Sequence, residues 1–100
     1  MLLLLAELAT KPAHTSEVET ILRELVDFAA NEPGTLYYAV HRQQDQPQTL
    51  IVVEQYRDRA ACDAHLQSAP VQEALRRFEN LLSASPTIRF ADTLAATGIA

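Results

Sequence analysis

Two short segments of the chain carry apolar residues at successive positions, and they restrict the possible fold more than any other feature. Residues 2–5 are all leucine, and residues 50–53 read Leu-Ile-Val-Val. Successive side chains of a β-strand point to opposite faces, so a strand with one solvated face should alternate apolar and polar residues. The two segments therefore predict strands that are covered on both faces.

The first third of the chain predicts a strand followed by a helix. Residues 1–10 form an apolar run that is short for a helix and is followed by Lys11-Pro12, which favours a strand. Ser16 and Glu19 have the spacing of a capping box and predict the start of a helix. That helix should end near Asn31, and its apolar stripe comprises Val18, Ile21, Leu22, Leu25, Val26 and Ala29.

A hairpin and a final strand are predicted from β-favouring residues. Residues 35–42 and 49–57 are rich in such residues, and the polar stretch 43–48 with its proline reads as the loop between them. Residues 87–94 follow Pro86 and predict the last strand.

The second helical region is predicted to be interrupted. Asp58 can cap a helix that runs to Gln67. Ser68-Ala69-Pro70 should break and restart it, because proline is well placed in a first turn. The helical spacing then continues as far as Leu82.

The order β-α-β-β-α-β predicts an α+β fold of the ferredoxin-like type, with a four-stranded antiparallel sheet and the helices on one face. We expect one domain over residues 1–100, with its core in 2–94 and a C-terminal tail at 95–100. Since helices can cover only one face of the sheet, a second copy covering the other predicts a homodimer. The alternative is a monomer whose strands are simply leucine-rich.

Charge and cysteine content exclude several classes of partner. The net charge is −5 and the eight basic residues are scattered, which argues against nucleic acid and against an anionic membrane surface as partners. A single cysteine, Cys62, cannot form an internal disulfide, and the opening segment lacks a basic flank, a cleavage site and the length to span a bilayer. We therefore expect a cytoplasmic protein.

Several segments, taken in order, resemble a known family. They are Asn31-Glu32-Pro33-Gly34 with Leu36 and Tyr38 after it, Val53-Glu54-Gln55-Tyr56, Ala61 to His65, and Ser68-Ala69-Pro70. Over Leu2 to Leu94 the chain resembles the antibiotic biosynthesis monooxygenase (ABM) domain of the dimeric α+β barrel superfamily.

The resemblance implies a homodimer with its two sheets stacked face to face, and a ligand pocket in each chain between sheet and helices. Some members of the family oxygenate polycyclic phenols or quinols with O₂, without a metal or prosthetic group. Others isomerise a phosphorylated signalling sugar, degrade haem, or have no known activity. Because the sequence shows no metal, flavin or nucleotide motif, no cofactor is expected.

Two residues are candidates for catalysis. His65, near the end of the second helix, could project toward the sheet and take a proton from a phenol or quinol. Its structural alternative is a hydrogen bond to a backbone carbonyl at the helix break. Glu54 lies within the strongest strand, where a carboxylate is costly unless it is paired or functional. It could orient His65 or accept a substrate hydroxyl, or it could pair with an arginine.

Tyrosines are the candidates for binding a substrate. Tyr56 shares a strand face with Glu54 and could stack on a flat substrate, or it could be core. Tyr38 matches the family tyrosine, while Tyr37 should point to the opposite face, and which of the two meets the pocket is left open. No metal site is expected, because the three histidines do not have the close spacing of metal ligands. Cys62 and His65 together would supply only half of the ligands of a zinc site.

These features lead to a hypothesis about function. We expect a cofactor-independent monooxygenase that oxidises a small aromatic phenol or quinol to a quinone with O₂. The alternatives are an isomerase of a small carbonyl compound, or a ligand-binding or stress-response dimer without turnover. Haem degradation is disfavoured, because the haem-degrading members of the family use a tryptophan and a haem-ligating histidine. This chain has no tryptophan and carries Leu75 where we align that histidine.

Overall fold

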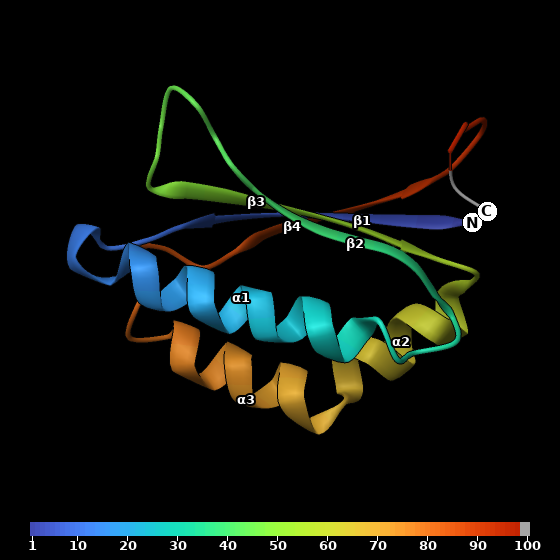
Figure 1. Cartoon of the computed structure of the whole chain (residues 1–100), viewed down its shortest axis with the longest axis horizontal. Helices are drawn as coiled ribbons and strands as arrows, with labels where there is room; N and C mark the ends of the chain where they lie inside the picture. The colour runs from blue at the N-terminus through green and yellow to red at the C-terminus, as the bar shows by residue number, and fades with distance from the viewer. Residues whose placement is uncertain (99–100) are drawn as a thin grey trace.

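The computed structural model describes residues 1–98 and has one four-stranded sheet with its helices on a single face (Figure 1). The elements along the chain are β1 (Leu2–Ala9), a short 3₁₀ turn η1 (Pro12–His14), α1 (Thr15–Ala29), β2 (Thr35–Arg42), β3 (Thr49–Tyr56), α2 (Arg59–Gln67), α3 (Ala69–Phe78) and β4 (Thr87–Asp92). The predicted ferredoxin-like α+β fold is confirmed.

The sheet has the strand order β2-β3-β1-β4 with every neighbouring pair antiparallel. On the face toward the helices, Leu4 is paired with Glu54 of β3 and with Phe90 of β4. The core lies between this face and the apolar stripes of α1 and α3. Its largest fully buried side chains include Leu4, Ile21, Leu22, Leu50 and Tyr56.

The opposite face of the sheet, here called the outer face, has an apolar centre. Leu5, Val53 and Ala39 lie side by side across β1, β3 and β2, and all three are half-buried. At the β4 side, Arg89 lies 3.6 Å from Glu7. No helix of residues 1–98 covers the outer face (Figure 1). Both faces of the central strands are therefore apolar, as the unbroken apolar segments predicted.

The predicted capping box at the start of α1 is wrong. The helix begins at Thr15, and the N-cap position is held by His14 without a side-chain cap. The 3₁₀ turn η1 leads straight into the helix, so Ser16 is already in the first turn. Glu19 does not turn back to the helix start, because its carboxylate receives a hydrogen bond of 2.6 Å from Arg42 on β2.

The second helical region follows the prediction at its start and at its break. The Asp58 carboxylate accepts a hydrogen bond of 2.9 Å from the Ala61 backbone N–H, and Ser68 separates α2 from α3. The predicted continuation to Leu82 is wrong, because α3 ends at Phe78. The chain there turns toward the sheet, and Leu82 forms an isolated β-bridge with Thr10.

The predicted tail at 95–100 falls partly outside the described residues. Residues 95–98 belong to no helix or strand, and residues 99–100 are not described. Just before them, the Thr93 backbone N–H donates to the carbonyl of Met1, and the Thr93 hydroxyl accepts from the Gln55 side chain. Among the described residues, no helix has the length and apolar character needed to cross a membrane.

Candidate active site

His65 is the centre of a buried polar cluster between the sheet and the helices. It lies in the last turn of α2 and is 1% exposed. Its ring centroid lies 5.3 Å from that of Tyr38, 5.6 Å from that of Tyr56 and 6.1 Å from that of Phe28. The Asp58 cap and the Ser68 break define the start and end of α2 and so turn this side chain toward the sheet.

Glu32 holds the imidazole from the helix side. Its Oε1 lies 2.6 Å from His65 Nδ1 and also accepts a hydrogen bond of 3.2 Å from the Thr35 hydroxyl. A neutral imidazole that donates Nδ1–H to a carboxylate keeps the lone pair on Nε2. This role was not predicted from the sequence, although Glu32 belongs to one of the segments that resemble the family, and that segment was the available signal.

Glu54 lies on the other side of the ring, at the Nε2 end. It is 5% exposed, and its Oε1 is 3.8 Å from His65 Nε2, which is too long for a hydrogen bond. The Tyr56 hydroxyl donates to the same carboxylate oxygen. Within residues 1–98, His65 is the only basic side chain within 4 Å of this carboxylate, so the arginine pair considered from the sequence is absent there.

Burial controls the protonation of this cluster. Burial raises the pKa of the Glu54 carboxyl above its usual value, while the Tyr56 hydrogen bond and His65 partly offset this effect. Burial also raises the pKa of the Tyr38 and Tyr56 hydroxyls, and the charge of Glu54 adds to it. Both tyrosines therefore stay protonated at neutral pH. Because the Tyr56 hydroxyl is already hydrogen-bonded to Glu54, Tyr38 is the tyrosine of this pair that is left to contact a ligand.

The structure resolves which strand tyrosine faces the site. Tyr38 lies on the helix side of β2 against His65, whereas Tyr37 is 42% exposed and points to the outer face. Cys62 is fully buried in the core, where burial raises the pKa of its thiol to about 11. A thiol with this pKa is a poor nucleophile. Residues 1–98 contain no group of three or more potential metal ligands.

A small cavity extends from the cluster into the core. It has a volume of about 60 Å³, and most of its wall is apolar, with Tyr38, Glu54 and His65 as its polar groups. Leu75 of α3 and Ile88 of β4 also line it, and they are 40% and 45% exposed. The cavity therefore meets the surface between α3 and β4. Its volume corresponds to about two water molecules in the liquid.

The burial of Glu54 should make folding depend on pH in a way that Glu54→Gln removes. Because the folded-state pKa is raised above 4.5, the folded protein holds this proton more tightly than the unfolded chain. Stability from this group is lost as pH rises from 4.5 through the folded-state pKa. We expect the melting temperature of Glu54→Gln minus that of wild type to be positive at pH 7 and to shrink toward pH 4.5. A difference that does not change with pH would contradict this, and the same substitution at exposed Glu24 is the control.

Comparison with known proteins gives matches over most of the chain. A family model described as antibiotic biosynthesis monooxygenase matches residues 1–77. No curated protein matches. The fold is similar to the crystal structure of an antibiotic biosynthesis monooxygenase, with a TM-score of 0.88, 26% identity, and coverage of 95% of this chain and 100% of that chain.

Two further solved structures are similar along nearly their whole length. PA3566 from Pseudomonas aeruginosa is 31% identical, with a TM-score of 0.86 and coverage of 94% of each chain. Rv0793 from Mycobacterium tuberculosis has a TM-score of 0.91 at 21% identity, with coverage of 97% of this chain and 98% of that chain. At 21% identity, the likeness to Rv0793 concerns the fold alone.

Proposed function

Because the chain belongs to the antibiotic biosynthesis monooxygenase family, we propose that it oxidises a small aromatic phenol or quinol to a quinone with O₂, without a cofactor. The observation that carries this proposal is the geometry of His65. Its Nδ1 lies 2.6 Å from the Glu32 carboxylate, and its Nε2 lies on the side of Glu54, which lines the same cavity. This is the arrangement of a base with an orienting carboxylate.

The reaction begins with a proton transfer. His65 Nε2 takes the proton of a substrate hydroxyl, and the Glu32 carboxylate stabilises the imidazolium that forms. The phenolate gives one electron to O₂, and the two radicals combine at a ring carbon to form a hydroperoxide, which receives the proton from His65. Breaking the O–O bond releases water, and the ring carbon loses its hydrogen to become a carbonyl. One phenol and one O₂ give one quinone and one water.

The other predicted residues have distinct roles in this proposal. Glu54 keeps its proton more readily because it is buried, which raises its pKa, and it serves as a hydrogen-bond donor to the substrate oxygen. The Tyr56 hydroxyl holds the Glu54 carboxyl in place through its hydrogen bond. The Tyr38 ring forms the part of the cavity wall against which a flat substrate ring packs. The cavity of about 60 Å³ must widen between α3 and β4 to admit a ring, because small-molecule sites have volumes of about 300–1,000 Å³.

We also propose that two copies pair through their outer faces in the cytoplasm. The row of Leu5, Val53 and Ala39 is apolar and has no helix over it within residues 1–98. Burying such a face against a second copy is favourable at about 25 cal/mol per Å² of apolar surface. Cys62 is a buried thiol without a disulfide partner in the described chain, which is compatible with a reducing compartment.

Oxygen uptake with a panel of phenols and quinols tests the function. We expect wild-type protein to consume O₂ above the uncatalysed rate, His65→Ala to lose this activity, and Glu32→Gln to fall between them, since its amide cannot stabilise the imidazolium by charge. His14→Ala is the matched control, because His14 lies at the far end of α1 and makes no side-chain cap. The proposal fails if wild type never exceeds the uncatalysed rate, or if His65→Ala matches it.

The same panel should be run without oxygen. An isomerase of a small carbonyl compound would form product under anaerobic conditions, and a binding protein would raise its melting temperature with the ligand but form no product. Either result in place of oxygen uptake would replace the proposed reaction with another use of the same cluster.

A further inference from the structure

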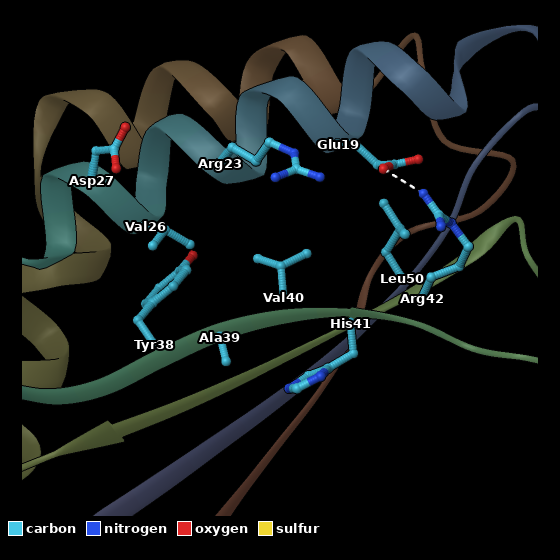
Figure 2. A pocket seen from close by; sticks show the side chains of 10 residues that line it. All are labelled: Glu19, Arg23, Val26, Asp27, Tyr38, Ala39, Val40, His41, Arg42 and Leu50. Carbon is cyan, nitrogen blue, oxygen red and sulfur yellow. Dashed lines mark hydrogen bonds and ion pairs between the residues drawn. The ribbon is translucent and has the colours of Figure 1, made fainter.

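A second and much larger hollow lies on the helix side of the sheet, between α1 and the edge strand β2 (Figure 2). It is here called the α1–β2 groove. Its volume is about 590 Å³, against about 60 Å³ for the cavity beside His65. This volume falls within the range of small-molecule sites, about 300–1,000 Å³. The lining residues used below are Glu19, Arg23, Val26 and Asp27 of α1, Tyr38, Val40 and Arg42 of β2, and Leu50 of β3.

The groove has an apolar floor and a charged rim. Val26 and Val40 are half-buried and Leu50 is buried. The α1 residues are spaced so that they share one side of the helix, and the three β2 residues alternate along the strand, so that they share one face. Ala39 and His41 also border the groove, and Figure 2 shows their side chains on the other side of β2 from that of Val40. Such a surface suits a ligand with one flat apolar part and one charged part.

The charges on the rim are unequally paired. Arg42 Nη2 lies 2.6 Å from Glu19, and the Arg42 side chain is still 54% exposed. In the described part of the chain, the ion pairs within 4 Å include neither Arg23 nor Asp27. Figure 2 shows the Arg23 guanidinium reaching from α1 toward Val40. Asp27 lies toward the Tyr38 end of the groove (Figure 2). The rim therefore carries two positive and two negative charges, and Arg23 is the arginine among them that has no close carboxylate partner in the described chain.

We infer that the α1–β2 groove binds a small aromatic carboxylate. The carboxylate pairs with Arg23, whose planar fork of N–H groups matches two carboxylate oxygens, and Arg42 offers the donors that Glu19 leaves free. The ring lies on Val26 and Val40. A single negative charge is favoured over a dianion, because the carboxylates of Glu19 and Asp27 border the same groove and would repel a second charge.

Tyr38 connects this groove to the His65 cluster. It lines both hollows, and its ring centroid is 5.3 Å from that of His65. A ring bound in the groove would therefore lie against the side chain that separates it from the base. The binding of a carboxylate does not depend on the proposed function, whereas the delivery of a carboxylate-bearing phenol to His65 rests on it.

The test compares naphthoate with naphthalenemethanol, which has the same ring system but no charge, by isothermal titration at about 50 mM and about 500 mM salt. At low salt we expect naphthoate to bind at least about tenfold more tightly than the alcohol. High salt should weaken only naphthoate. Arg23→Gln should remove the preference for naphthoate. Arg76→Gln is the matched control, because Arg76 is an exposed arginine on α3 paired with Glu73, and it should leave both affinities unchanged.

Three results would overturn the inference: no binding of naphthoate, equal binding of the two probes, or an unchanged naphthoate affinity in Arg23→Gln. Arg23 is exposed, so its replacement should not impair folding. The outcome is separate from that of the oxygen-uptake test. Naphthoate binding without oxygen uptake would support the groove and reject the proposed reaction, and oxygen uptake without naphthoate binding would do the reverse.

Discussion

Replacing Val53 with aspartate is expected to convert the proposed dimer into a folded monomer. Val53 lies in the middle of the outer face, between Leu5 of β1 and Ala39 of β2. In a face-to-face dimer the new carboxylate would be buried without a partner, at a cost of about 3 kcal/mol or more. A cost of about 3 kcal/mol weakens association by more than about 100-fold. Sedimentation at micromolar concentration should show the change in mass.

Two controls separate the loss of the interface from a loss of folding. Val53→Thr keeps the size and the branched shape without a charge and should stay dimeric. Glu54→Gln changes the next residue of the same strand on the opposite face and should also stay dimeric. A wild-type protein that sediments as a monomer, or a Val53→Asp variant that remains a dimer, would reject the interface. Circular dichroism checks that each variant keeps its helices and strands.

Local periodicity was enough to predict that Glu54, Tyr56 and His65 share one side of the sheet. Positions separated by two along a strand share a face, and the Asp58 cap together with the Ser68 break sets the orientation of His65 on its helix. These are short-range features, and the structure retains them. The apolar positions 50–53 likewise predicted two apolar faces, which divide into Leu50 with Val52 beneath the helices and Ile51 with Val53 outside.

The parts that were not predicted depend on contacts between distant segments. Glu32 contacts His65 because the turn after α1 folds back against α2. The spacing of residues along a single helix or strand carries no information about this contact between distant segments. The sheet face to which the Tyr38 side chain points depends on an irregularity in the pairing of β2 with β3, which lies between Thr35 and Tyr37. The pattern at Ser16 failed for a related reason, since the turn before it made Thr15 helical and the fold gave Glu19 a partner on β2.

Gly34→Ala is expected to destabilise the protein and to be rescued by Ala61→Gly. Gly34 ends the turn that carries Glu32, and a Cβ added there would clash with the Ala61 Cβ in the first turn of α2. The Gly34 carbonyl also accepts a hydrogen bond of 2.9 Å from the Arg57 backbone N–H, so the turn cannot simply move away. Overpacking of this kind costs about 1–3 kcal/mol of unfolding free energy, which corresponds to a fall of about 4–8 °C in Tm for each kcal/mol.

The rescue is what identifies the cause. Ala61→Gly alone should cost up to about 1 kcal/mol, because glycine is unfavourable in a helix. In the double variant the methyl group added at position 34 would occupy the space that the Ala61 side chain leaves, so the two losses should not add and a coupling of about 1–3 kcal/mol should appear in urea unfolding. Additive losses would mean that the turn and α2 are not in close contact. Because Glu32 and His65 lie on these two segments, Gly34→Ala should also weaken any activity of His65, and the double variant should recover it.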